Sequence, residues 1–486
     1  RCGCSEARIA RAETTSGSAT HLVRLDERER SESSVGASAG PPELALSTLG
    51  VEMNKQTSLT VVACLMAVFG LLTSSGCSRP AEDSRAEVPS ASGAGDPTAV
   101  TIHWETLQRK GQRGDNWCMT WAADDNLYTM MDDGIGWNED GVRWGTKFLQ
   151  ISGDESFDGS DVKEMPGWPF NPEEITFYGY GTYSVDGRIY VWLFKSDVDR
   201  YYGRPIANRL LYTDDLGQTF HRWDGTKVTA DNFGDTDPES FFFYKEDPRL
   251  KYDDEYAYAF NWIAFCQNGK DNSAARDDYV YMYAVEQYDV RRLSLIRVHK
   301  SKVTDRSAYE YLKELNGETP VWTSDMSERG ATVIYPERNY NGEEWHWSSW
   351  FPSVVYNPGL DRYLMVSYGV SDPNKEYFEG WCHRCARSST VGMWHSRNPW
   401  GPWTRFYYQP EWKTPGDPPA EWGFDGEASR TYQFKLNPKW IYDEGRTMYL
   451  IWSDAGGRWD GDHFGHSSYW YRWNQVKITL ELGEAE

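Results

Sequence analysis

The sequence predicts an all-β protein, a single five-bladed β-propeller with four-stranded antiparallel blades. Beyond residue 100, short aromatic and β-branched runs bounded by Gly, Asp and Asn recur, and no long stretch has the period of a helix. A hairpin turn followed by an aromatic strand occurs five times, at residues 124–132, 186–194, 277–286, 360–368 and 444–454. Such regular recurrence is typical of blades around an axis. Two stacked β-sandwiches, the alternative fold, leave the fivefold spacing unexplained.

Composition limits the classes of partner. The chain has 486 residues, a formal net charge of −23, and 15% aromatic residues. An acidic chain lacks the basic surface that phosphate binding needs, so we expect no nucleic-acid partner. Many aromatic residues in a polar chain suit a β-rich protein with wet aromatic surfaces.

The amino-terminal part is expected to lie outside the folded domain. Residues 1–52 are poor in aromatic residues and read as a disordered or wrongly annotated extension. Residues 53–77 read as a signal peptide that ends in small residues before Cys77, similar to the lipobox of bacterial lipoproteins. A plain secretory signal is the alternative. Residues 78–98 then form a flexible linker, and residues 99–482 form the propeller. We expect an outer-membrane lipoprotein, or location at the cell surface or in the periplasm.

Two further features fit a propeller. Residues 213–220 look like the Asp-box of sialidase-type propellers, in which an Asp caps a turn between outer strands, so Asp215 is expected to be structural. Closing the ring requires the first strand to join the last blade, and residues 100–104 are suitably positioned for this.

The five repeats share a tyrosine, and the residue five positions after it is polar or aromatic in every copy. Equivalent strand ends of a propeller lie on one face near the axis, so these five side chains are expected to converge on one pocket. A solvated surface is the alternative. They are Asp133, Lys195, Glu286, Tyr368 and Asp454.

A pair of carboxylates in the first repeat is the main candidate for catalysis. Residues whose numbers sum to about 248–250 face each other across the first hairpin, and Asp115 and Asp133, whose numbers sum to 248, meet this condition. Carboxyl groups ~5 Å apart suit a retaining glycosidase, in which one is the nucleophile and the other the acid. Repulsion between them would raise one pKa and so supply the acid form. A one-residue slip would put Asp132 in place of Asp133, and ordinary turn residues are the other interpretation.

Several segments resemble a known family. Residues 292–312, 353–365, 398–404 and 438–454 are similar to a secreted bacterial family of propeller domains of unknown function, related to mycobacterial-type endo-D-arabinanases and more distantly to five-bladed furanosidases. The resemblance covers most of residues 100–480. In the arabinanase relatives the catalytic acids lie in the first blade, in a context similar to residues 114–134 here. Carried over by position, they are Asp115 and Asp133.

Other residues are candidates for substrate contacts. Trp347 and Trp350 could form a sugar platform, because indole faces stack on sugar rings, and His395 could line the same face. Most other tryptophans near the proposed rim are expected to pack between blades. These are Trp117, Trp137, Trp168, Trp345, Trp381, Trp400, Trp403 and Trp422. Weaker candidates for the pocket are His463, His466, Arg276, Arg387 and Arg430, with Asp425 and Glu427 as a second acidic pair.

Cysteine spacing favours structure over metal chemistry. Cys382 and Cys385 lack the second ligand pair of a zinc site, and in an exported protein a local disulfide is the simpler expectation. Cys118 and Cys266 are either a second bridge or two buried thiols. No calcium-loop pattern occurs. We expect no cofactor, and a structural cation in the channel is left open.

Together these features predict a monomeric, lipid-anchored extracellular propeller that hydrolyses a glycosidic bond of a polysaccharide or oligosaccharide with retention. Asp115 and Asp133 would be the reacting pair, and Lys195, Glu286 and Asp454 would contact hydroxyls. The alternatives are a non-catalytic glycan-binding propeller, a polysaccharide lyase with Tyr368 or a His as base, and a protein-binding propeller.

Overall fold

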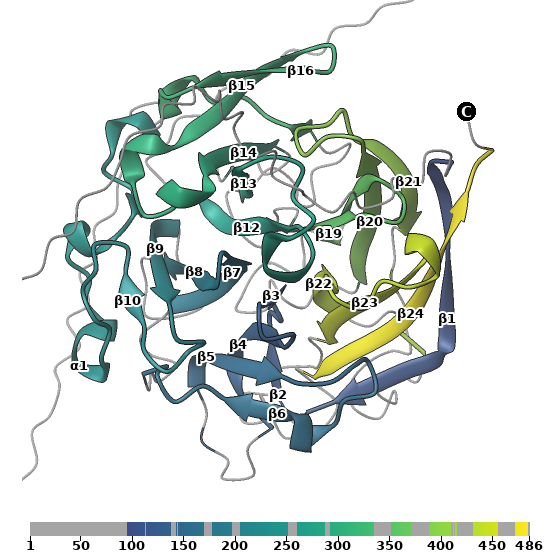
Figure 1. Cartoon of the computed structure of the whole chain (residues 1–486), viewed down its shortest axis with the longest axis horizontal. Helices are drawn as coiled ribbons and strands as arrows, with labels where there is room; N and C mark the ends of the chain where they lie inside the picture. Colours follow the sequence, from purple (N-terminus) through teal and green to yellow (C-terminus); the bar gives the residue numbers. More distant parts are fainter. Residues whose placement is uncertain are drawn as a thin grey trace, which may run out of the picture. The chain divides into compact units, whose positions relative to one another are not determined.

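The computed structural model describes residues 95–111, 113–137, 142, 144–169, 177–196, 205–250, 260–286, 292–334, 351–371, 388–409, 412, 414–415, 431–454 and 472–484. All of them belong to one compact unit, Asp83–Glu486. The described strands form five blades around a central axis, which Figure 1 shows end-on, so the predicted five-bladed propeller is confirmed. The strands within each blade are antiparallel, and the innermost strands of the third and fourth blades also pair with each other in parallel, Cys266 with Val354 and Gln267 with Val355.

Each blade starts at the axis and continues outward. Blade 1 contains β2 (Arg113–Asp115), β3 (Met119–Trp121), β4 (Leu127–Gly136), β5 (Trp144–Ile151) and β6 (Val162–Glu164). Blade 2 contains β7 (Phe177–Val185), β8 (Arg188–Ser196), β9 (Pro205–Thr213) and β10 (His221–Arg222), with β11 (Phe243–Tyr244) paired to β9. Blade 3 contains β12 (Asn261–Gln267), β13 (Tyr279–Val285), β14 (Arg292–His299), β15 (Glu310–Asn316) and β16 (Thr319–Thr323), with β17 (Val333–Ile334) paired to β14.

The last two blades complete the ring. Blade 4 contains β18 (Phe351–Asn357), β19 (Arg362–Ser371), β20 (Ser388–Ser396) and β21 (Thr404–Gln409). Blade 5 contains β22 (Thr431–Leu436), β23 (Thr447–Asp454), β24 (Trp473–Leu482) and, as its outermost strand, β1 (Pro97–Lys110). One short α-helix, α1 (Ala230–Phe233), lies among the described residues. The described 3-10 turns are η1 (Gly159–Asp161), η3 (Pro238–Ser240), η4 (Pro248–Leu250), η5 (Lys270–Asn272), η6 (Lys300–Lys302), η7 (Arg306–Ala308), η8 (Met326–Glu328) and η13 (Asp443–Gly445).

The first strand closes the ring, as the sequence predicts. β1 runs antiparallel to β24, with partners from Pro97 and Leu482 at one end to Lys110 and Trp473 at the other. Trp104 of β1 packs against Trp412 and Trp452, with ring centroids 5.3 and 6.2 Å apart. The last blade is therefore built from both ends of the described chain.

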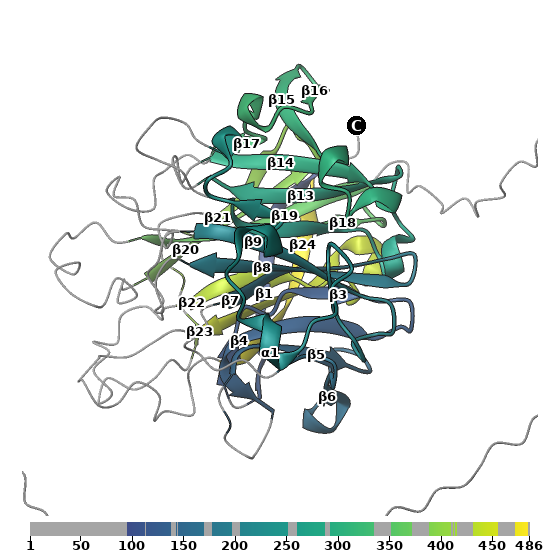
Figure 2. The ribbon, with the colours of Figure 1, turned by 90° about the vertical axis from the view of Figure 1, so that its left-hand side faces the viewer.

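The five sequence repeats correspond to the second strand of each blade, β4, β8, β13, β19 and β23. Each follows a hairpin from the innermost strand, so all five run in the same direction. We call the end where they finish the site end, and the end with their hairpins the hairpin end. Figure 2 shows the strands from the side, running between these two ends.

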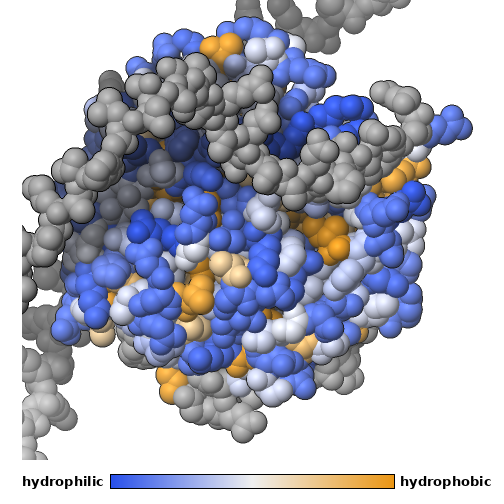
Figure 3. Space-filling view, viewed as in Figure 1, coloured by the Kyte–Doolittle hydropathy of each residue, from blue (hydrophilic) through white to orange (hydrophobic). Residues whose placement is uncertain are grey.

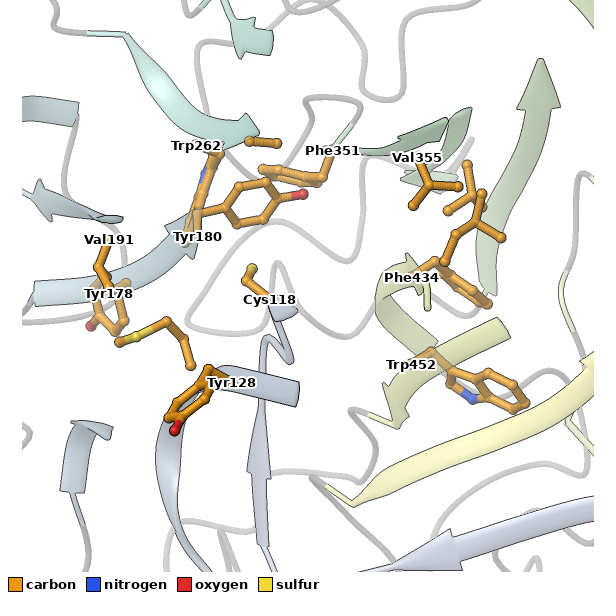
Figure 4. Close-up of a cluster of buried hydrophobic side chains, with 14 of the residues drawn as sticks. Cys118, Tyr128, Tyr178, Tyr180, Val191, Trp262, Phe351, Val355, Phe434 and Trp452 are labelled. Atoms are coloured by element: carbon orange, nitrogen blue, oxygen red, sulfur yellow. The ribbon is translucent and has the colours of Figure 1, made fainter. Parts of the chain in front are cut away.

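Aromatic side chains fill the space between blades. Figure 4 shows one such cluster, to which the inner strands of several blades contribute, with Phe434 and Trp452 on one side and Trp262 and Tyr180 on the other. Tyr180 of blade 2 packs against Trp262 of blade 3, with ring centroids 5.2 Å apart. Burying each large apolar side chain contributes about 1.5–3 kcal/mol, and an aromatic pair adds about 0.5–1.5 kcal/mol. The ring of blades is thus held mainly by aromatic packing.

The connection between β12 and β13 bridges three blades at the hairpin end. Asp271 accepts hydrogen bonds from the Ser184 hydroxyl at 2.7 Å and from the Gly187 N–H at 3.0 Å. Lys270 lies 3.3 Å from a carboxylate oxygen of Asp125 in blade 1. Figure 3 shows the face seen in Figure 1 to be mostly hydrophilic, with scattered apolar residues. Within the described ranges, no helix is long and apolar enough to cross a membrane.

Candidate functional site

Three buried carboxyl groups lie on two adjacent strands at the site end of blade 1. Asp115 ends β2, and Asp132 and Asp133 lie in β4. Their exposed fractions are 5%, 2% and 5%. Asp115 pairs directly with Asp132, so the expected pairing of Asp115 with Asp133 is wrong by one residue.

The slip has a local cause in the inner strand. β3 pairs with β4 in the predicted register, with Thr120 opposite Tyr128. Between β2 and β3 the chain makes a tight turn, in which the Cys118 N–H donates to the Asn116 carbonyl at 2.6 Å and Asn116 has a φ of 57°. This turn takes up one additional residue and moves Asp132 opposite Asp115.

Asp132 connects blade 1 to blade 2. Both of its oxygens accept the Gly179 N–H of β7 at 3.0 Å, and Oδ2 also accepts the Asn116 side-chain amide at 2.9 Å. A Cβ at Gly179 would lie 2.6 Å from Cε of Met130, so glycine permits this close approach. The carboxyl group of Asp132 is therefore fixed by neighbouring backbone and side chain.

The three carboxyl groups interact electrostatically. Burial raises the pKa of Asp132 well above its usual value, and the charge of Asp133 raises it further, against the hydrogen bonds from Asn116 and Gly179. Like charges this close cannot all ionise. The cluster of Asp115, Asp132 and Asp133, which we call the acid cluster, therefore retains a proton at neutral pH.

Asp133 has an unusual backbone. Its φ is 51°, in the left-handed region that Asp tolerates better than most residues. Strand β4 also bulges here. Arg113 and Asp115 have one residue between them, whereas their partners, Gly136 and Asp132, have three. A bulge breaks the alternation of side chains, so Asp133 need not face away from Asp132.

Sequence reasoning missed Lys435. It lies in β22 of blade 5, is 3% exposed, and its Nζ is 3.8 Å from the ring centre of Tyr180 in blade 2. Asp115, Asp132 and Cys118 all interact with it electrostatically, and burial lowers its pKa. A lysine with an apolar residue on each side, Phe434 and Leu436, is a signal that could have revealed it.

A cavity lies on the axis beside the acid cluster. Residues from the inner strands of all five blades line it, and about 20 Å³ is open to the centre of a water molecule, which is room for about one water. Its polar lining includes one residue from each blade: Cys118, Thr182, Gln267, Ser353 and Lys435.

Tyr368 is brought close to the acid cluster. It is buried, stacks on Phe351 at 5.1 Å, and interacts with Asp115 and Cys118. Burial raises its pKa well above the usual value, and the charge of Asp115 adds to this. Tyr368 therefore keeps its proton at neutral pH.

Two other members of the predicted ring of polar residues are held within their own blades. Glu286 pairs with Arg329 at 2.8 and 3.3 Å and also accepts a hydrogen bond from Ser294. Lys195 is buried, with its Nζ 5.4 Å from the ring centre of Phe177. Asp454 pairs with Thr431 in the backbone, and its side chain is outside the described part. The predicted convergence of all five is not observed for Glu286.

His395 and Arg276 lie away from the acid cluster. His395 pairs with Leu364, near the start of β19, and is thus toward the hairpin end, whereas Tyr368 lies toward the site end. Its Nδ1 is 3.8 Å from Asp96, and burial lowers its pKa. Arg276 donates to the Arg397 carbonyl at 2.8 Å and lies 3.5 Å from Asp361. The expectation that His395 lines the same face as the acids is therefore wrong.

The described tryptophans are mostly packing residues. Trp117 and Trp168 are buried, and Trp400 packs near Tyr281 and Trp322 in the core of blades 3 and 4. Asp215 accepts hydrogen bonds from the backbone and hydroxyl of Thr219 at 2.8 and 2.7 Å and so caps its turn. Cys118 and Cys266 are free and buried, so of the two alternatives the buried thiols are observed.

Other predicted residues fall outside the described part of the chain. They are Trp347, Trp350, Trp345, Trp381, Trp422, Cys77, Cys382, Cys385, Arg387, Arg430, His463, His466, Asp425 and Glu427. In the ranges that the structure covers, no group of three His, Cys, Asp or Glu residues is placed to hold a metal ion.

No protein-family model matches this sequence, and no curated protein matches it either. Solved structures of similar fold include a family 62 α-L-arabinofuranosidase catalytic domain from Coprinopsis cinerea, with 9% identity, 80% of this chain and 98% of that chain covered, and a TM-score of 0.37. A glycosyl hydrolase from Bacteroides ovatus has 10% identity, with 81% and 96% covered and a TM-score of 0.40. A family 32 β-fructofuranosidase from Bombyx mori has 13% identity, with 77% and 62% covered and a TM-score of 0.38. These similarities concern the fold alone and carry no argument about activity.

Proposed function

We propose that this protein is a retaining glycoside hydrolase that acts on an extracellular polysaccharide, with its reaction centre at the acid cluster. The observation that supports this best is the group of three buried carboxyls, Asp115, Asp132 and Asp133, on adjacent strands near the axis. Buried acids whose proton affinities differ can supply both an anion and a proton donor. Retaining glycosidases need both groups ~5 Å apart.

Asp115 and Asp133 are the reacting pair in this proposal, and Asp132 positions them. Both oxygens of Asp132 are already engaged by Gly179, and one also by Asn116, so it has little capacity to contact a sugar. In the first step one carboxylate oxygen bonds to the anomeric carbon as the glycosidic C–O bond breaks, and the other carboxyl gives its proton to the leaving oxygen. In the second step a water molecule gives a proton to the carboxylate that served as the acid. Its oxygen bonds to the anomeric carbon as the bond between that carbon and the enzyme carboxylate breaks.

The remaining parts of the proposal concern location. Residues 53–77 would direct export, and a lipid on Cys77 would anchor the protein to the membrane on the outside, beside its substrate. Metabolic labelling with a fatty acid, lost in Cys77→Ala, tests this part separately. Transfer of the label to another residue contradicts it.

The activity test is a panel of polysaccharides that includes arabinans and uronate-rich polymers. We expect reducing ends to be released, with the first-formed anomer retaining its configuration in NMR spectra. Asp115→Asn and Asp133→Asn should each lose at least about two orders of magnitude in kcat, because each removes a reacting group. Asp231→Asn, which changes an exposed acid of α1, is the matched control and should keep full activity.

Other results identify other functions. Binding of a glycan without product, unchanged in both variants, would indicate a lectin-like propeller. Products that absorb ultraviolet light would indicate a lyase. Either result excludes the hydrolase proposal.

A further inference from the structure

Lys435 is a buried cation on the propeller axis. No oxygen of the described residues accepts a hydrogen bond from its Nζ, and it interacts electrostatically with the Cys118 thiol, Asp115 and Asp132. Its Nζ lies over the face of Tyr180. An ammonium group in such a place is costly unless other charges balance it.

The ring of Tyr180 and a water molecule in the cavity offset part of the cost of burying the ammonium group. An aromatic face attracts a desolvated cation. The cavity has room for a water molecule. That water can accept a hydrogen bond from Lys435 and donate one to the side-chain amide oxygen of Gln267 or to the Thr182 hydroxyl. Neither partner carries an opposite charge.

Only acids can supply the opposite charge. Among the described groups that interact with Lys435, the Cys118 thiol stays neutral because burial raises its pKa to about 12. Asp115 and Asp132 remain as possible anions, and both interact with Lys435. Tyr368, which faces Asp115 from blade 4, also stays neutral, and Asp133 reaches the group through Asp132.

We propose that Lys435 is the positioning cation of the acid cluster: its buried ammonium, held against Tyr180 in the axial cavity, keeps the Asp115 carboxylate ionised. The same charge compensates the ionised acid within a site that water barely enters. Lys435 does not contact the reacting atoms. It acts through Asp115.

This inference also assigns roles to Asp115 and Asp133, and that assignment rests on the proposed hydrolase function. If Asp115 is the stabilised anion, it is the nucleophile, and Asp133 takes the acid role of the proposed reaction. The electrostatic part of the inference does not depend on any activity and can be measured without a substrate.

The first experiment follows the carboxyl groups by infrared spectroscopy across a pH titration of the full chain. In Lys435→Met we expect the titration of one buried carboxyl to move up by about 1 to 3 pH units, because an opposite charge nearby has been removed. Adding Asp115→Asn to Lys435→Met should abolish the moved titration and so assign it. Lys110→Met is the matched control. That lysine donates to the Glu155 and Phe157 carbonyls, and its charge acts on the exposed acids Asp154 and Asp158. It should therefore leave the titration of the buried carboxyl unchanged. An unmoved titration in Lys435→Met overturns the proposal.

A second experiment uses the unmodified protein, so that a folding failure of Lys435→Met leaves the test intact. Nitrogen-15 NMR of labelled lysine side chains reports whether the buried amine is charged. We expect an ammonium signal at neutral pH that responds when the cluster titrates. A neutral amine at pH 7 overturns the proposal.

Activity measurements separate this proposal from the proposed function. In an active protein, Lys435→Met should lower kcat far more than it changes KM, and the acid side of the pH profile should move to higher pH. If no substrate is cleaved but the carboxyl titration moves as expected, the hydrolase proposal fails and the role of Lys435 stands. If a substrate is cleaved and both the carboxyl titration and the pH profile are unmoved in Lys435→Met, the hydrolase proposal stands and the role of Lys435 fails.

Discussion

Asp132 binds the backbone N–H of Gly179 with both carboxylate oxygens, each 3.0 Å from the nitrogen. The contact joins β4 of blade 1 to β7 of blade 2, so the acid cluster is part of the interface between these blades. Substitutions in this interface should therefore affect both the stability of the fold and the acid cluster.

Gly179→Ala should destabilise the protein by about 1–3 kcal/mol, as overpacking in a tight core does. The new Cβ would lie 2.6 Å from Cε and 2.8 Å from Cγ of Met130. Urea unfolding measures the change. Gly159→Ala is the control, because its Cβ would meet its nearest atom at 3.3 Å. Equal stability of the two variants would contradict the close approach seen here.

Asp132→Asn should change how stability depends on pH. The pKa of Asp132 is raised in the folded protein, chiefly by burial, so the folded state holds its proton more tightly than the unfolded state. Its stabilising contribution is present at low pH and is lost as pH rises through the folded pKa. The variant lacks this loss, so its melting temperature relative to the unmodified protein should rise from pH 4 to pH 8. A constant difference across that range would show that Asp132 titrates normally.

Glu286→Gln should cost about 3–5 kcal/mol of stability, because it leaves the charge of Arg329 buried without its partner. The two side chains are only 4% and 3% exposed. Glu310→Gln, which breaks the more exposed pair with Arg297 at 2.8 Å, should cost no more than about 1 kcal/mol. Urea unfolding compares them. Loss of activity in Glu286→Gln at unchanged stability would favour the substrate-binding role that the sequence predicts instead.

His395→Gln should make the protein less sensitive to mild acid. Burial lowers the pKa of His395 in the folded state, so below about pH 6.5 the unfolded chain takes up a proton that the folded protein does not. The contribution of neutral His395 is therefore present at neutral pH and is lost as pH falls. Thermal melts at pH 7.5 and 5.5 measure this, with His299→Gln on the exposed surface as control. The proposal of a buried neutral imidazole fails if both variants show the same change.

Much of the fold follows from the sequence because its determinants are local. Each repeat carries its own turn and its own aromatic strand, so the five copies mark β4, β8, β13, β19 and β23 without knowledge of the ring. The partner of β1 could also be predicted, because a ring of blades needs one closing strand. The hairpin register was right for Thr120 and Tyr128, where the strands are regular.

The acid cluster could be predicted only in part. The sequence by itself determined that Asp115 lies opposite one of two adjacent acids, Asp132 or Asp133, at the end of one hairpin, since strand pairing and residue spacing fix that. Only the tertiary structure decided which acid faces Asp115, because that depends on the turn at Asn116 and the bulge at Asp133. It alone brought Lys435 to them, since that contact joins the first and last blades and exists only once the ring has closed.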